Sequence, residues 1–78
     1  MKVYAYKSGE PLNEHGLLEL SEISLSADAK TVRAIAQFLT QAANEMDRLG
    51  EGYDHLHMQD VSSAWEEEWP DIIVCKSS

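Results

Sequence analysis

Two histidines, His55 and His57, are separated by one residue and would lie on the same side of an extended strand. Imidazoles at this spacing can bind zinc, with Asp54 or Asp60 adding an oxygen ligand. A zinc site needs three or four converging ligands, and no cysteine pair is present to complete a tetrahedron. The other interpretation of this pair is a polar sheet face whose histidines hydrogen-bond to nearby carboxylates. We favour that reading and predict no metal site and no cofactor.

Groups suited to catalysis are few. Cys75 lies in a run predicted to be a buried strand, where a thiol is usually an inert small hydrophobe. The serines stand in no nucleophile motif, and neither a glycine-rich phosphate loop nor a dinucleotide fingerprint is present. Glu66, Glu67 and Glu68 are consecutive, which is more typical of a solvated face than of acid–base machinery, and nothing in the sequence buries one to raise its pKa. We therefore predict that the chain is not an enzyme.

Two tryptophans flank these glutamates. Trp69 precedes Pro70, whose ring favours an extended Trp69 at the entry to the last strand, so we expect Trp69 in the core. We expect Trp65 at a groove or rim. Aromatic side chains supply contact area and carboxylates supply complementarity to a basic partner. The predicted partner-binding residues are Trp65, Glu66, Glu67, Glu68, Asp71, His55 and His57.

Length and composition predict one small folded domain over residues 1–78. The 44% hydrophobic and 26% charged residues are ordinary for a globular domain and too apolar for a disordered one. The single cysteine rules out an internal disulfide, which favours a reducing cytoplasm. No apolar run approaches the roughly 20 residues of a membrane span, and the first residues lack the apolar core of a signal peptide.

The formal net charge of −8 is large for 78 residues and is unevenly distributed. Between Glu45 and Asp71 there are nine acids and one base, Arg48. The charge therefore argues against binding to nucleic acid through phosphate neutralisation, and we predict no nucleic-acid partner. A basic protein partner, a cation or solubility alone remain as explanations for the charge.

Two strands are predicted before the central helix. Residues 2–7 contain two tyrosines and a valine, and turn-forming residues follow from Ser8 through Gly16. Residues 17–26 are predicted as the second strand. Leu20 and Ile23 have opposite parity there, so we expect either a β-bulge near residues 21–22 or a strand buried on both faces.

Residues 29–49 are predicted as one amphipathic helix, begun by Asp28 or Ser26 and ended by Gly50. We expect Phe38 and Leu39 to be buried against the sheet. The apolar residues that repeat at helical spacing are Val32, Ile35, Ala36, Leu39, Ala43 and Met46, widened by Phe38, Ala42 and Leu49. The residues expected on the exposed face include Gln37, Gln41 and Asn44.

Two more strands are predicted after the helix. Residues 55–59 alternate, which indicates a strand with one wet side. Residues 61–68 are predicted as a loop or a single turn, with a short helix begun by Asp60 as the alternative. Residues 71–75 form a β-branched run predicted to be buried on both faces. The resulting fold class is α+β in ββαββ order, an antiparallel or mixed four-stranded sheet with one amphipathic helix packed on one face.

The chain resembles immunity protein family thirty-two of bacterial polymorphic toxin systems. The resemblance covers most of the chain from Leu17 onward and includes Trp65. The matching segments are Leu18-Glu19-Leu20-Ser21-Glu22-Ile23-Ser24-Leu25, Ile35-Ala36-Gln37-Phe38-Leu39, Ala42-Ala43-Asn44-Glu45-Met46, His55-Leu56-His57-Met58-Gln59-Asp60 and Pro70-Asp71-Ile72-Ile73-Val74. The resemblance implies a small acidic α+β protein encoded beside the toxin that it neutralises.

Many toxins of such systems are nucleases with basic clefts, so the resemblance agrees with the charge. We expect an immunity protein that occludes the functional site of a basic cognate toxin. The alternative is a non-enzymatic structural or regulatory module, with a homodimer through an exposed sheet edge or the open sheet face as one form. A small metal-dependent enzyme is the third class.

Overall fold

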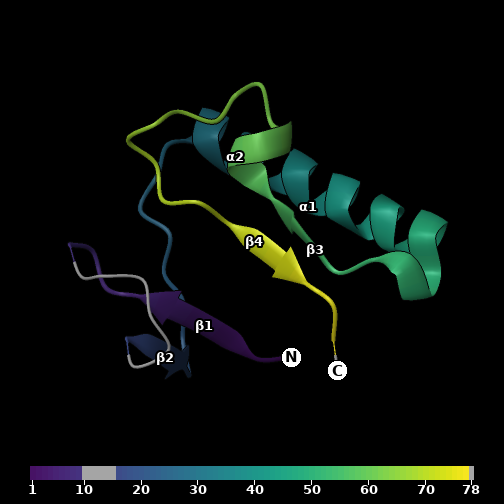
Figure 1. Ribbon diagram of the computed structural model, residues 1–78. Helices are drawn as coiled ribbons and strands as arrows, with labels where there is room; N and C mark the ends of the chain where they lie inside the picture. The colour runs from purple at the N-terminus through teal and green to yellow at the C-terminus, as the bar shows by residue number, and fades with distance from the viewer. Residues whose placement is uncertain (10–15, 78) are drawn as a thin grey trace.

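The fold is α+β, with two short hairpins and one long helix (Figure 1). A computed structural model describes residues 1–9 and 16–77, so most of the loop predicted between the first two strands lies outside the described residues. In chain order the elements are β1 (Val3–Tyr6), β2 (Leu17–Leu20), α1 (Ala29–Leu49), the 3₁₀ turn η1 (Gly50–Gly52), β3 (His55–His57), α2 (Met58–Val61) and β4 (Ile73–Cys75).

The described strands form two separate two-stranded sheets. β1 pairs antiparallel with β2, and β3 pairs antiparallel with β4. The prediction of a four-stranded sheet is therefore wrong, whereas the α+β class and the order of the four strands around α1 are confirmed. Side-chain alternation indicates which face of a strand is buried, but it carries no information about which edge pairs with which neighbour.

The second strand is shorter than predicted. β2 ends at Leu20, which pairs with Val3, the first residue of β1, so β1 offers no further ladder partner beyond this point. Ile23 and Leu25 follow outside any strand and are 61% and 56% exposed. The β-bulge expected near residues 21–22 is therefore absent, and so is the strand buried on both faces.

Both ends of the helix predicted over residues 29–49 are confirmed. Asp28 begins α1, because its Oδ1 accepts a hydrogen bond from the Thr31 N–H at 2.9 Å. That bond from Thr31 lowers the pKa of Asp28. Gly50 ends α1 with a positive φ of 53° and donates its N–H to the Met46 carbonyl.

The main core lies between α1 and the β3–β4 hairpin (Figure 1). Phe38 from α1 and Met58 from the start of α2 are 1% and 0% exposed. The half-buried residues that pack against this cluster are Ile35, Leu56, Val61, Trp65, Trp69, Ile72 and Val74. Burial of Phe38, and exposure of Gln37, Gln41 and Asn44, are as predicted.

The prediction that Leu39 is buried is wrong, because Leu39 is 47% exposed. The buried face of α1 is centred on Ala34, Phe38 and Ala42. Adjacent strands lie about 5 Å apart, whereas a helix with its side chains is about 10 Å wide, so a two-stranded hairpin covers only part of a wide apolar face. The residues on one side of that face, including Val32 and Leu39, remain uncovered.

The C-terminal strands are also shorter than predicted. β3 ends at His57, and Met58 and Gln59 already belong to α2, which therefore begins earlier than the predicted short helix. β4 is not buried on both faces, since Ile73 and Cys75 are exposed. α1 packs against one face of the β3–β4 hairpin, and the opposite face of the hairpin is open.

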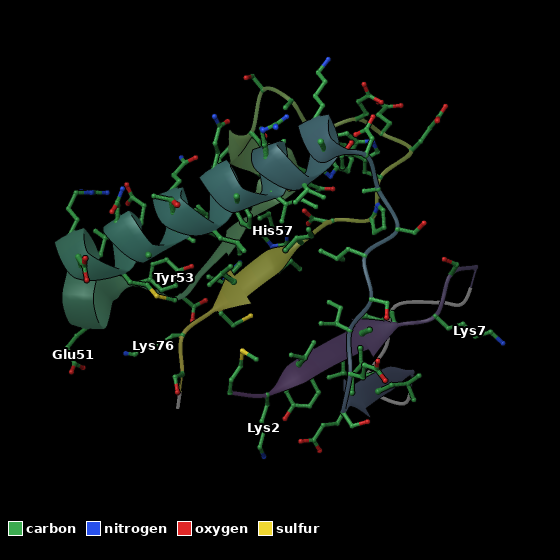
Figure 2. The ribbon with its side chains drawn as sticks, turned by 180° about the vertical axis from the view of Figure 1, so that it is seen from behind. Lys2, Lys7, Glu51, Tyr53, His57 and Lys76 are labelled. Atoms are coloured by element: carbon green, nitrogen blue, oxygen red, sulfur yellow. The ribbon has the colours of Figure 1, made fainter. Side chains whose placement is uncertain are left out.

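Tyr53 is the buried residue that packs next to the C-terminal end of α1. It lies between α1 and β4 (Figure 2), is 4% exposed, and donates its hydroxyl to the Val74 carbonyl at 2.6 Å. Lys76 continues this end, donating its backbone N–H to the Asp54 carbonyl at 2.8 Å. Within residues 1–9 and 16–77 we find no helix with the length and hydrophobicity that a membrane span requires.

Replacing the neighbours Phe38 and Leu39 separately by alanine tests which face of α1 is buried. Phe38→Ala should lower the free energy of unfolding by about 3–5 kcal/mol, because it leaves a cavity in the core. Leu39→Ala should lower it by less than about 1 kcal/mol, as is usual at the surface. Urea denaturation at low micromolar protein measures both. Equal losses would contradict the placement of α1.

Alkaline titration tests the burial of Tyr53. Burial raises the pKa of the Tyr53 phenol, as do the nearby Cys75 and Asp54. Above the unfolded value of about 10, the folded state holds a proton that the unfolded chain releases. The stability contribution is therefore fully present below pH of about 10 and is lost as pH rises through the folded pKa.

Tyr53→Phe should lack this alkaline loss of stability, because phenylalanine carries no phenol proton. Tyr4→Phe is the matched control, since Tyr4 is 49% exposed on β1, and it should behave like the unmodified chain. Urea denaturation at a series of alkaline pH values makes the comparison. A loss that persists in Tyr53→Phe would place the responsible group elsewhere.

Candidate functional site

Residues 62–70, which make up most of the segment between α2 and β4, are here called the tryptophan loop. It consists of two successive hydrogen-bonded turns. The Trp65 N–H donates to the Ser62 carbonyl at 3.2 Å, and the Trp69 N–H donates to the Glu66 carbonyl at 2.9 Å. Each turn therefore ends on a tryptophan. The prediction of a loop in this part of the chain is confirmed, although its backbone is more regular than an open loop.

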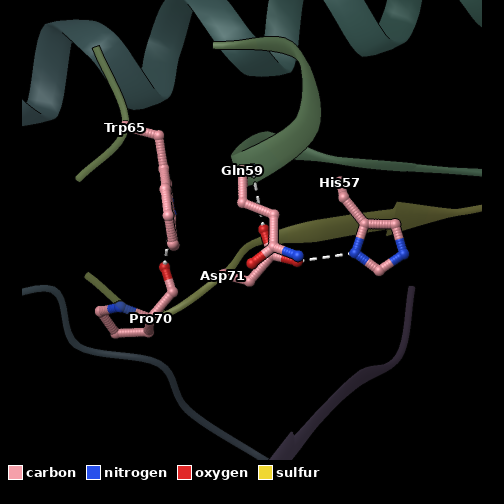
Figure 3. A network of polar contacts seen from close by, with 5 residues as sticks. All are labelled: His57, Gln59, Trp65, Pro70 and Asp71. Atoms are coloured by element: carbon pink, nitrogen blue, oxygen red, sulfur yellow. Dashed lines mark hydrogen bonds and ion pairs between the residues drawn. The ribbon is translucent and has the colours of Figure 1, made fainter. Parts of the chain in front are cut away.

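A side-chain hydrogen bond crosses the tryptophan loop. The indole Nε1–H of Trp65 donates to the Pro70 carbonyl at 3.3 Å (Figure 3). Trp65 and Trp69 are both half-buried, and both pack against the cluster that contains Phe38 and Met58. The predicted distinction between a core Trp69 and a rim Trp65 is thus not seen, because the loop anchors both rings at the edge of the same core.

Asp71 closes the base of the tryptophan loop. Its Oδ2 lies 2.6 Å from His57 Nδ1, and its Oδ1 accepts the Gln59 N–H at 3.0 Å (Figure 3). The Asp71 and His57 side chains are 20% and 30% exposed. The Met58 N–H also donates to the Ile72 carbonyl at 2.8 Å. Asp71 therefore ties the end of the loop to the first turn of α2, and its carboxylate is largely committed to the protein itself.

His55 and His57 lie on the open face of the β3–β4 hairpin, where their rings meet edge to face with centroids 5.0 Å apart. The exposed His55 Nδ1 lies 2.6 Å from Asp54 Oδ2, so each histidine has its own carboxylate. Cys75 is directly opposite His55 across the hairpin and is exposed. In the part of the chain that the structure describes, no three histidine, cysteine or acidic side chains converge as metal ligands.

An open cleft of about 520 Å³ lies between the tryptophan loop and the first turn of α1. Both tryptophans line it, together with the acidic residues Asp28 and Glu66 and the basic residue Lys30. The lining is completed by Thr31, Ser63 and Ala64. The cleft thus combines large aromatic surface with two carboxylates, a combination suited to a basic side chain.

The predicted site residues divide into three groups. Trp65 and Glu66 line the cleft, and Glu67 and Glu68 are exposed beside it on the second turn. Asp71 with His57 forms the base of the loop. The exposed His55 lies further along β3, beside Asp54 rather than the cleft.

The sequence did not indicate Ser63 and Ala64 of the tryptophan loop as cleft residues, nor three residues at the start of α1: Asp28, Lys30 and Thr31. The three α1 residues precede the tryptophan loop by more than thirty positions in the chain, and their local pattern indicates only the start of a helix. Only the packing of α1 across the hairpin brings them to the tryptophans, so no local signal could have found them.

Fold and site together describe a small α+β protein with an acidic, aromatic loop beside an open cleft. The family model described as Immunity protein 32 matches residues 22–77, which include α1, the β3–β4 hairpin and the tryptophan loop. The chain belongs to this family. β1 and β2 precede the matched range. Comparisons with curated proteins and with solved structures find no significant match.

Two histidine–aspartate pairs have the same Nδ1–Oδ2 distance of 2.6 Å and differ in exposure, which allows a test of the base of the tryptophan loop. We expect His57→Ala and Asp71→Ala to couple by about 0.5–3 kcal/mol in a double-mutant cycle on unfolding, since this pair is shielded and holds the loop. The control cycle with His55→Ala and Asp54→Ala should show almost no coupling, because that pair is exposed. Urea denaturation measures both. Equal coupling in the two cycles would contradict a structural role for Asp71.

Proposed function

We propose that this family member is an immunity protein that binds a cognate bacterial toxin with a basic surface and occludes the functional site of that toxin. The tryptophan loop carries the proposal. It presents Glu66, Glu67 and Glu68 on one tight turn, beside two tryptophans anchored to the core. Residues 62–70 contain no basic residue, so the loop itself offers one sign of charge to a partner.

The construction of the loop suits tight binding. Its two turns, the Trp65–Pro70 hydrogen bond and the Asp71 base hold it in one conformation before a partner arrives. A surface that is already ordered has less conformational entropy to lose on binding. The exposed glutamates act earlier, because clustered charge of one sign accelerates the encounter with an oppositely charged surface.

The cleft is proposed to receive an arginine or lysine side chain of the toxin. A guanidinium or ammonium group favours the face of an indole, and Trp65 and Trp69 both line this cleft. Glu66 and Asp28 supply carboxylates for the same group. Lys30 opposes it, but its long flexible side chain can turn away from the cleft at small cost.

The chemistry of the toxin follows from the same charge argument. A cleft that binds a phosphate backbone must be basic, so a nuclease is one class of toxin that this acidic surface would fit. Inhibition would then be occlusion, with no reaction performed by the immunity protein. We place the encounter in the cytoplasm, where the exposed thiol of Cys75 would stay reduced.

The direct test is capture of the product of the neighbouring toxin gene, followed by binding kinetics with variants. Trp65→Ala should weaken the complex mainly through faster dissociation, by at least about tenfold if Trp65 is a central anchor. The double variant Glu66→Lys with Glu67→Lys should slow association and flatten its dependence on salt.

The matched control is Glu19→Lys with Glu22→Lys. These glutamates are also exposed, and the double change alters net charge by the same amount. It should leave the salt dependence closer to that of the parent protein. If both double variants bind equally fast at low salt, the tryptophan loop is not the recognition surface. The charge of −8 would then be a property of solubility.

A further inference from the structure

One side of α1 is apolar and uncovered. Val32 and Leu39 are each 47% exposed, and Ala36 and Ala43 between and beyond them are also exposed. These four residues are here called the α1 seam. Their spacing alternates four, three and four positions, and the half-buried Met46 continues it. Alternation of threes and fours is the pattern by which one helix packs along another.

The seam is separate from the core-facing side of α1. Each helical residue turns about 100° around the axis, so Leu39 points about 100° away from Phe38 and Ala36 about 160° away. At the cleft, Thr31 and Lys30 point about 100° and 160° away from Val32, and Asp28 lies beyond the seam, about 16 Å along the axis from Leu39. A partner on the seam would therefore leave the tryptophan loop and its cleft open.

The charge distribution favours a second copy of this chain as that partner. α1 contains Lys30, Arg33 and Arg48 but only two acids, Glu45 and Asp47, so the helix carries +1 while the rest of the chain carries −9. Two such molecules repel each other least where their helices meet. A basic toxin would be attracted more strongly to the acidic tryptophan loop than to α1.

The seam is also self-complementary in one direction. Leu39 has ten residues of α1 on either side. An antiparallel pair centred there brings Ala36 toward Ala43 of the second copy, and the small side chains permit close approach of the two backbones. It also brings the exposed Arg33 beside Asp47 of the second copy, once on each side of the two-fold axis. A parallel pair would instead leave Arg33 and Asp47 of the two copies fourteen positions apart, about 21 Å along the axis, and would lose this ion pair.

We propose that α1 pairs antiparallel with α1 of a second copy through the α1 seam. The interface is one helix wide, so the dimer belongs to the small, transient class and forms at high protein concentration. Both tryptophan loops stay accessible, and the dimer carries two toxin sites. The pairing stands independently of the toxin-binding function.

Sedimentation at increasing protein concentration tests the pairing. The unmodified chain should shift from monomer to dimer, and Leu39→Glu should remain monomeric because it places two like charges at the two-fold axis. Gln37→Glu is the matched control, since it adds the same charge at an exposed position about 130° from the seam. It should dimerise like the parent. A parent protein that stays monomeric at the highest concentration, or equal loss in both variants, overturns the proposal.

Cysteine cross-linking tests the direction. In a Cys75→Ser background, Leu39→Cys should form a disulfide-linked dimer under mild oxidation, because the two copies meet at this residue. Val32→Cys should not, since fourteen helical positions separate it from its counterpart in the antiparallel pair, about 21 Å along the axis. Equal cross-linking at both positions overturns the antiparallel arrangement.

Toxin capture separates the seam from the toxin site. Monomeric Leu39→Glu should still capture the toxin as well as the parent does, because the cleft lies at the first turn of α1 and Leu39 does not line it. If the parent is monomeric and Leu39→Glu abolishes capture, the seam is a toxin-binding face and the dimer proposal fails.

Discussion

The burial of Phe38 with Met58 is the packing on which the rest of the molecule depends. Phe38 comes from the middle of α1, and Met58 is the residue at which β3 becomes α2, so their cluster joins the helix to the hairpin. The Met58 N–H also bonds to Ile72, where the chain returns to β4. One buried cluster therefore both closes the core and holds the base of the tryptophan loop. A chain of this size buries only about 60% of its unfolded surface, so it has little other packing to replace this cluster.

A second constraint is that two strands are too narrow for the helix that they carry. α1 presents more apolar surface than the β3–β4 hairpin can cover, and the remainder appears as the exposed Val32 and Leu39. The same shortage leaves Ile73 exposed on the open face of the hairpin. Exposed apolar groups are ordinary when scattered, but along α1 they are contiguous and regularly spaced, which gives them the character of a contact surface.

The two surfaces of α1 have different physical characters. At its first turn, Asp28 and Thr31 meet the tryptophans in a cleft where charge and aromatic area are combined. Along its side, the seam is apolar and nearly neutral. A single helix can serve both because its residues radiate in all directions, and because the hairpin occupies only the sector around Phe38. Both surfaces lie within residues 22–77, the range that the Immunity protein 32 family model matches.

The sequence by itself determined the elements whose signals are local. The bounds of α1 follow from a capping residue at its start, Asp28 or Ser26, from a helical apolar repeat and from Gly50 at its end. The acidic, aromatic composition of residues 62–70 is also given directly by the sequence. Tertiary structure alone decided that the strands form two hairpins, that Leu39 stays outside the core, that Asp71 is consumed in closing a loop, and that Asp28 joins the cleft. Pattern specifies which side of an element is apolar, but the partner that covers it, and how much it covers, depend on contacts between residues far apart in the chain.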